Sequence, residues 1–164
     1  MVSTETTPLP GTVHRAVSGQ YSTFDVAGFY FGIDVLQVQE VLRYQEMTPV
    51  PLAPAVIEGL INLRGQIVTA LDMRRCLSLP PRSEGETAMN VVVRTEGGVV
   101  SLLVDEIGDV VEVESSSFER PPENIDPAIR NLVQGVHKLK GRLLLVLDIE
   151  QTLKLETGDG KLVR

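Results

Sequence analysis

The sequence predicts a mainly β protein built from two similar lobes, and three observations support that fold class. About ten short segments are rich in Val, Ile, Leu or aromatic residues and are bounded by Gly, Pro or polar residues, as β-strands separated by turns are. Helical patterns are few and brief. A segment of 14 residues recurs at a constant offset of 76 residues, and such a recurrence suggests two similar structural units.

Length, charge and cysteine content narrow the class of protein further. A chain of 164 residues most simply forms one domain, or two small lobes that share a core. The net charge of -7 disfavours nucleic-acid binding, which needs clustered Lys and Arg. Cys76 is the single cysteine, so no internal disulfide forms. Apolar runs such as Leu143–Leu147 are too short to insert in a membrane, and the N-terminus lacks a secretory signal, so we expect a cytoplasmic protein.

The first half of the chain contains an arm, strands and a short helical turn. Residues 1–19 are rich in Ser, Thr, Gly and Pro without an apolar period, which predicts a flexible N-terminal arm. Asp34–Gln39 predicts one or two helical turns, and Leu79–Glu86 predicts a linker. The strands expected in this half are Tyr21–Val26, Phe29–Ile33, Val41–Met47, Gly59–Leu63 and Ile67–Leu71.

The second half contains a similar series of strands and ends in a helix. The expected strands are Met89–Thr95, Val99–Val104, Val110–Val113, Leu132–Leu139 and Leu143–Leu147. Asp148 at an N-cap position and Gln151 three residues later predict a short C-terminal helix over 148–156. We therefore expect one domain over residues 20–156, with approximate lobes 20–78 and 88–147 and a tail 157–164; the strand number is typical of a barrel or sandwich.

The internal repeat assigns a structural role to four glycines. Each copy holds a strand, a turn with Gly where positive φ is tolerated, and a second strand that ends at Asp. Gly59, Gly65, Gly135 and Gly141 are therefore interpreted as serving backbone geometry. The coinciding residues are Gly59, Leu63, Gly65, Leu71 and Asp72 in the first copy and Gly135, Leu139, Gly141, Leu147 and Asp148 in the second.

Two residues raise the alternative of an enzyme. His137 opens the string HKLKG, which resembles the run around the phosphorylated histidine of phosphotransfer domains. Such a histidine needs a long helix, whereas Gly141 is followed by an apolar run of β character, so we expect His137 in a β-hairpin. Cys76 follows Arg74 and Arg75, which can lower a thiol pKa, but no histidine is near it in sequence. No phosphate loop, zinc constellation or nucleotide-binding glycine run is present, so we predict no catalytic residue, metal or cofactor.

Several motifs occur in an order and spacing that resemble one family. Gly59–Gly65 reads GLINLRG and is followed by an apolar strand and Asp72–Arg74; Phe31–Val41 reads FGIDVLQVQEV. Together with the Pro49–Pro54 loop and Leu103–Asp105, these motifs resemble the CheW family of bacterial chemotaxis coupling proteins from about Gln20 to Thr152. Two positions depart from the family pattern. Thr69 stands where Pro is frequent, and Ser101 stands where Gly is common and could narrow a place of partner approach.

The resemblance implies both a fold and a function. The implied fold is two five-stranded SH3-like β-barrels around a common core, with short helices. The implied function is a non-catalytic adaptor that binds the regulatory domain of the chemotaxis histidine kinase and the cytoplasmic tip of methyl-accepting chemoreceptors, and joins other CheW-like proteins in array rings. Such an adaptor would be cytoplasmic and recruited to the inner face of the membrane through receptors, without inserting directly.

One alternative remains within the same fold, namely a CheW-like regulatory module of a larger kinase or of a receiver-fused protein. The sequence shows no receiver-type acidic pocket, and it ends soon after the C-terminal helix. Both features favour a free-standing adaptor.

The resemblance also selects candidate contact residues for kinase and receptor. Val38 and Glu40 fall in the matching partner-binding segment, and Val35 would share a helical face with Val38. Arg64, on the turn before Gly65, is either an anchor for a partner carboxylate or half of an internal salt bridge. Ile107 and Val110 either line a groove between the barrels or pack in the core. The alternative for Val38 is core packing, and the alternative for Glu40 is a solvated surface charge.

Overall fold

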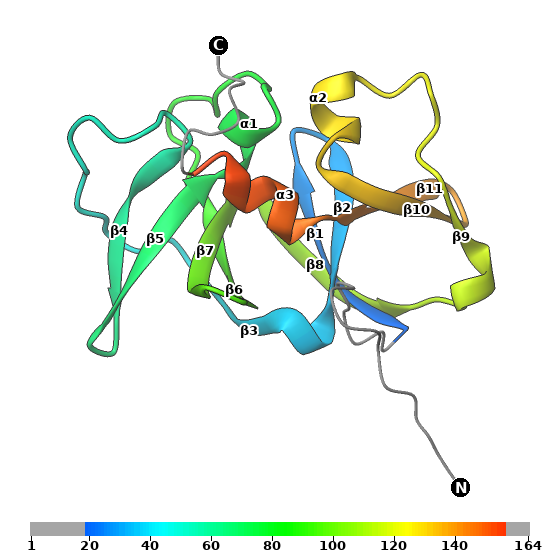
Figure 1. Cartoon of the computed structure of the whole chain (residues 1–164), viewed down its shortest axis with the longest axis horizontal. Helices are drawn as coiled ribbons and strands as arrows, with labels where there is room; N and C mark the ends of the chain where they lie inside the picture. The colour runs from blue at the N-terminus through cyan, green and yellow to red at the C-terminus, as the bar shows by residue number, and fades with distance from the viewer. Residues whose placement is uncertain (1–18, 157–164) are drawn as a thin grey trace, which may run out of the picture.

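The computed structural model describes residues 19–156, and they form two β-sheets packed against each other (Figure 1). Except for Gly19, the arm expected at residues 1–19 lies outside the described residues, as does the tail 157–164. The first sheet has the order β8-β1-β2-β11-β10-β9 and the second the order β3-β6-β7-β5-β4. The mainly β fold class is therefore confirmed.

The strands are short, and their bounds follow the apolar segments of the sequence. The first sheet comprises β1 (Gln20–Val26), β2 (Phe29–Asp34), β8 (Glu106–Glu112), β9 (Phe118–Glu119), β10 (Val133–Leu139) and β11 (Arg142–Leu147). The second comprises β3 (Val38–Leu42), β4 (Ile57–Leu63), β5 (Gln66–Asp72), β6 (Met89–Thr95) and β7 (Gly98–Val104). The first sheet has a sixth strand because the two-residue β9 pairs with β10.

Two strand boundaries differ from expectation. The strand expected over Val41–Met47 runs over Val38–Leu42 instead. Beyond Leu42 the chain turns toward β4, where Thr48 pairs with Leu60. The strand expected over Val110–Val113 begins at Glu106. Its charged residues Glu106, Asp109 and Glu112 broke the apolar pattern, and such charges are tolerated because β8 is an edge strand with exposed positions.

The sequence repeat corresponds to a pair of equivalent hairpins. Hairpin β4–β5 belongs to the second sheet and hairpin β10–β11 to the first. The second strand of each hairpin also pairs in parallel with a strand distant in sequence, β5 with β7 and β11 with β2. The similarity of the two halves thus extends from sequence to strand pairing.

The two sheets do not coincide with the lobes expected at residues 20–78 and 88–147. Strands β1 and β2 join β8 to β11, while β3 to β7 form the other sheet. The chain crosses between sheets at the 3₁₀ turn Val35–Gln37 and again at Asp105, between β7 and β8. The sheets combine strands from both lobes because β11 pairs in parallel with β2. Parallel neighbours cannot be joined by a tight hairpin, so the partner of β11 comes from a distant part of the chain.

Three layers of apolar side chains hold the sheets. The central layer lies between the sheets and includes Phe24, Phe31, Leu102 and Leu145. Alternate residues of β6 show how strand periodicity divides the layers, since Val91 and Val93 face the central layer and Val92 faces Ile61 and Val68 on the other side. Tyr21, Leu144 and Val146 form a third cluster on the first sheet. Apolar residues therefore line both faces of each sheet, as in curled, barrel-like sheets.

The helices are short and each begins at an aspartate. They are α1 (Met73–Cys76), α2 (Pro127–Arg130) and α3 (Ile149–Lys154), with a second 3₁₀ turn at Ser115–Ser117. The Asp148 Oδ1 atom accepts a hydrogen bond from the Gln151 N–H at 3.2 Å, as the capping pattern predicted. Asp72 and Asp126 cap α1 and α2 in the same way. Within residues 19–156, no helix has the length and apolar character needed to cross a membrane.

Candidate functional site

Arg64 projects from a rigid two-residue turn between β4 and β5. Its φ is 52° and that of Gly65 is 90°, so both turn residues adopt left-handed backbone conformations. Two positive φ values in succession define the turn that best matches the twist of a hairpin. The side chain of Asn62 accepts a hydrogen bond from the Gly65 N–H at 2.8 Å and holds the turn further. The base of the Arg64 side chain is therefore well positioned.

The guanidinium of Arg64 meets Glu40 of β3, twenty-four residues earlier in the chain. Arg64 Nη1 donates to Glu40 Oε2 at 2.8 Å, and Nη2 donates to Oε1 at 2.6 Å. These hydrogen bonds lower the pKa of Glu40 and raise that of Arg64. Because β3 and β4 are the two edge strands of the second sheet, the pair connects opposite ends of that sheet. The internal salt bridge, one of the two alternatives for Arg64, is present in the structure.

This pairing still leaves part of Arg64 available. The Arg64 side chain is 70% exposed, against 19% for Glu40. A guanidinium has five N–H donors in a planar fork, and only two of them donate to Glu40. The remaining donors can therefore reach a partner while Glu40 holds the orientation of the plane.

Val35 and Val38 precede Glu40 in the chain and are half-buried. Val35 begins the 3₁₀ turn that leads into β3, and Asp34 caps that turn by accepting a hydrogen bond from the Leu36 N–H at 2.9 Å. Val38 packs against the central apolar layer, which is the core alternative. The exposed apolar residues of this segment are instead Leu36, at 55%, and Val41, at 42%. Sequence reasoning missed both because an exposed side chain leaves no mark on strand periodicity.

Ile107 and Val110 lie elsewhere, on edge strand β8 of the first sheet. Ile107 is half-buried and packs against the central layer, whereas Val110 is 56% exposed and lies opposite Ser22 of β1. Exposed acidic residues flank Val110 at Asp109 and Glu112. The six expected contact residues therefore occupy both sheets, with Glu40 and Arg64 on the second and Ile107 and Val110 on the first.

The four glycines divide into two roles, each repeated in both hairpins. Gly65 and Gly141 have φ values of 90° and 83° at the hairpin turns. Gly59 and Gly135 instead permit close approach. A Cβ on Gly59 would lie 2.8 Å from the Thr48 carbonyl oxygen, and one on Gly135 would lie 2.7 Å from the Glu119 carbonyl oxygen and against the Phe118 ring.

A group of charged residues gathers at Asp105, where the chain crosses from the second sheet to the first. Asp105 accepts hydrogen bonds from the Ala27 N–H at 2.7 Å, from Arg74 Nη2 at 2.7 Å and Nε at 3.1 Å, and from Arg82 Nε at 3.1 Å. Burial raises the Asp105 pKa, but the hydrogen bonds from Arg74 and Ala27 and the charges of both arginines outweigh it, so the pKa is lowered. The sequence motifs contain Arg74 and Asp105 separately, and only the fold brings them together.

His137 lies in the β10–β11 hairpin, as expected, and only 1% of its surface is exposed. Burial lowers its pKa. A phosphotransfer histidine must present its imidazole to another protein, so the buried position of His137 argues against the phosphotransfer hypothesis.

Two further residues singled out in the sequence are buried. Cys76 is buried, and burial together with the nearby charge of Asp72 raises its pKa to about 12. The neighbouring Arg74 and Arg75 pair with Asp105, Asp72 and Glu58. Ser101 is fully buried and donates a hydrogen bond to Asn90 Oδ1 at 2.7 Å. It therefore cannot narrow a place where a partner approaches.

Comparison with known proteins gives consistent matches over most of the chain. The family model described as "CheW-like domain" matches residues 20–157. The chain is 30% identical to chemotaxis protein CheW of Klebsiella aerogenes, over 87% of this chain and 86% of the relative. It is 31% identical to chemotaxis protein CheW of Bacillus subtilis, over 82% and 86%. The solved structure of the scaffolding protein TtCheW from Thermoanaerobacter tengcongensis aligns with a TM-score of 0.71 at 27% identity, covering 79% of this chain and 88% of that chain.

Proposed function

The chain belongs to the family of CheW-like domains, and from that membership we propose that it is a non-catalytic adaptor that couples chemoreceptors to the chemotaxis histidine kinase. The observation that carries this proposal is the match of the family over residues 20–157. Two relatives of which the chain covers 86% bear the name of a chemotaxis protein, and a structurally similar protein is described as a scaffolding protein. An adaptor works by binding two partners at once, and it acts in the cytoplasm at the inner face of the membrane, where receptors recruit it.

The kinase-binding surface in this proposal centres on Glu40 and Arg64. Interfaces of this kind combine a few charged anchors with apolar contacts that exclude water. Arg64 supplies the exposed charge, Glu40 orients it, and Leu36 and Val41 supply exposed apolar surface on the same chain segment. Val35 and Val38 support that segment from beneath, since both are half-buried.

The receptor-binding surface in this proposal lies on β8. Val110 is the exposed apolar contact, and Ile107 positions the strand by packing in the central layer. Because the two surfaces lie on different sheets, one molecule can hold the kinase regulatory domain and the receptor tip together. The same surfaces allow other CheW-like proteins to join the chain in array rings.

Co-sedimentation with the kinase regulatory domain and with a receptor cytoplasmic fragment tests the proposal. We expect Arg64→Ala and Glu40→Lys to weaken kinase binding and Val110→Asp to weaken receptor binding, each with the other interaction retained. Arg75 and Glu58 provide the matched control, because they form another exposed ion pair, between α1 and β4, with N and O atoms 3.2 Å apart. Arg75→Ala should leave both interactions unchanged. Binding of the wild-type chain to neither partner would refute the proposal.

A further inference from the structure

The Pro49–Pro54 loop holds a leucine in a backbone conformation that leucine disfavours. The φ of Leu52 is 66°, in the left-handed region, where a Cβ crowds the following carbonyl oxygen and Gly or Asn is preferred. The Ala53 N–H donates to the Val50 carbonyl oxygen at 3.3 Å, which closes a turn around Pro51 and Leu52. A type II turn has this order, with Pro second and a positive φ third. The turn therefore favours Gly or Asn at this position, and the chain has Leu.

The Leu52 side chain gains no packing that offsets this strain. Its relative exposure is 103%, so it buries no apolar surface. It is the last of four successive exposed apolar residues that begin at Pro49, and no charged residue occurs from Met47 to Ile57. Such runs are avoided on surfaces that have no binding role. The fold of the chain therefore does not explain why a leucine occupies this position.

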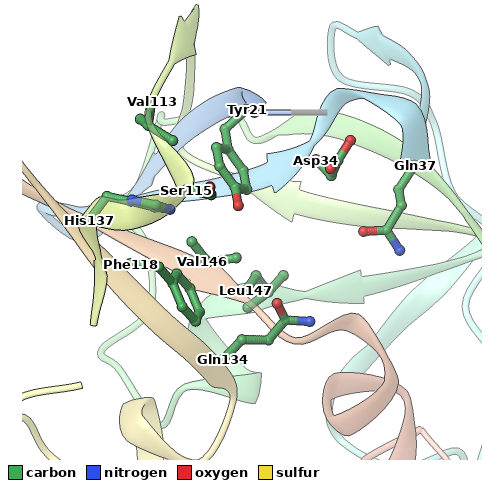
Figure 2. Close-up of a pocket in the computed structure, with 11 residues that line it drawn as sticks. Tyr21, Asp34, Gln37, Val113, Ser115, Phe118, Gln134, His137, Val146 and Leu147 are labelled. Carbon is green, nitrogen blue, oxygen red and sulfur yellow. The ribbon is translucent and has the colours of Figure 1, made fainter. Parts of the chain in front are cut away.

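The exposed residue Phe118 has a packing role that Leu52 lacks. Phe118 is 43% exposed and lines an apolar pocket on the first sheet together with Val113 and His137 (Figure 2). Its ring centroid lies 5.3 Å from that of His137, and its ring fills the space beside Gly135 where a Cβ would otherwise stand. The position of Phe118 is thus explained by contacts within the chain, whereas the exposure of Leu52 leaves no comparable packing.

The loop presents Leu52 on a fixed support. Before the turn, Thr48 exchanges two backbone hydrogen bonds with Leu60 of β4, at 2.9 Å and 2.8 Å. After the turn, the Ala55 carbonyl oxygen accepts a hydrogen bond from Arg75 Nη1 at 2.9 Å. The prolines of the loop add to this, because their φ angles are fixed by the ring. A side chain held in place before binding loses less conformational freedom on binding, which favours affinity.

The loop and Arg64 flank the same edge strand. β4 is an edge of the second sheet, and Thr48 pairs with it on the side away from β5. Figure 1 shows the loop before β4 at the upper left and the β4–β5 turn, which carries Arg64, at the lower left. The seven residues of β4 span about 20 Å, and an interface of about 800 Å² per partner is roughly 30 Å across. One partner can therefore cover both ends of the strand.

We propose that Leu52 inserts into an apolar pocket with an uncharged rim on the kinase regulatory domain, which contacts Arg64 at the other end of β4. This inference rests on the proposed adaptor function and extends its kinase-binding surface. The receptor-binding surface lies on the first sheet, whereas the loop adjoins the second, so the kinase is the partner. The rim is uncharged because the loop has no charge from Met47 to Ile57, and a charge covered by it would lose its water without gaining a partner.

Leu52→Asn separates the contact from the turn, because Asn tolerates a positive φ and removes the apolar side chain. Calorimetric titration of the full chain with the kinase regulatory domain should show an affinity lower by about fivefold or more. The midpoint of thermal unfolding should rise by about 2–4 °C, because the backbone strain is relieved. Leu52→Met keeps both the strain and an apolar side chain, so it should retain most of the affinity and the original midpoint.

Ser78→Asn is the matched control, since Ser78 is exposed and has a φ of 59°. It should raise the unfolding midpoint in the same way and leave kinase affinity unchanged. A lower midpoint in Leu52→Asn would show that the leucine packs within the chain, and would overturn the inference.

The binding data distinguish this inference from the function on which it rests. Unchanged affinity in Leu52→Asn, with binding weakened in Arg64→Ala, would overturn the role of Leu52 and leave the adaptor function standing. A wild-type chain that does not bind the kinase domain would overturn both. Loss of self-association in Leu52→Asn, with kinase affinity unchanged, would assign the contact to a second copy of the chain and overturn the inference.

Discussion

Arg64, on the β4–β5 turn, donates two hydrogen bonds to Glu40 of β3, at 2.8 Å and 2.6 Å. The pair makes a specific double-mutant test possible, because it distinguishes an anchor for a partner from an internal brace. If Arg64 contacts a partner carboxylate directly, exchanging the two residues places a carboxylate opposite that carboxylate, and the two repel each other. If the pair acts only within the chain, the exchange restores it.

The first prediction therefore concerns Arg64→Ala and the exchange Glu40→Arg with Arg64→Glu. We expect Arg64→Ala to weaken kinase binding about fivefold or more, as interface anchors do, with little change in stability because the side chain is 70% exposed. We expect the exchange to leave kinase binding weak. Calorimetric titration measures the affinities. Recovery of full affinity in the exchanged protein would show that Arg64 acts only as a brace.

The second prediction concerns Asp105, whose carboxylate pairs with two arginines that are each 14% exposed. Asp105→Ala leaves both guanidinium groups without this partner and should lower the free energy of unfolding by about 2–4 kcal/mol. Urea denaturation measures the change. Glu58→Ala, which breaks a more exposed pair with Arg75, is the control and should have a much smaller effect. Equal effects of the two substitutions would mean that the Asp105 pairs contribute no more than a surface pair.

The third prediction concerns Gly135, which the Phe118 ring and the Glu119 carbonyl closely approach. Gly135→Ala should destabilise the chain by about 1–3 kcal/mol, because the added methyl forces β9 away from β10. Gly97→Ala is the matched control, since nothing lies within 4 Å of a Cβ at that position. Thermal unfolding compares the two variants. A stability of Gly135→Ala that equals the control would show that β9 moves freely.

The fourth prediction is a pH dependence caused by His137. Burial holds its folded pKa below the unfolded value of about 6.5, so the unfolded chain binds a proton first as the pH falls. Stability from this residue is therefore complete above about pH 6.5 and declines below it until the folded pKa is reached. Urea denaturation between pH 7.5 and about pH 5 should show the decline. In His137→Phe, this part of the decline should be absent.

The fifth prediction concerns the thiol of Cys76. Its pKa of about 12 and its burial predict that it stays protonated and inaccessible in the folded chain. Alkylation at pH 8 should be at least about a hundredfold slower than in urea, where an exposed thiol has a pKa near 8.5. Mass spectrometry follows the reaction. Rapid alkylation without denaturant would contradict the buried position and reopen a role for this cysteine.

The sequence alone was sufficient for the features that depend on short-range pattern. Strands such as Met89–Thr95 were predicted with their observed bounds because their apolar residues alternate between two buried faces. The cap at Asp148 and the turn at Gly65 followed from local backbone requirements. Family membership also followed, because it depends on the order and spacing of motifs along the chain.

The tertiary structure decided the features that join distant residues. Parallel pairing of β11 with β2 carries β1 and β2 into the sheet of the second half, so the sheets do not follow the halves of the sequence. The same long-range packing brings Arg74 to Asp105 and buries His137 beside Ser117. The periodicity of a sequence shows which face of its own strand or helical turn a residue occupies. Which side chain it meets depends on how the sheets curl and cross, because that geometry is a property of the whole chain.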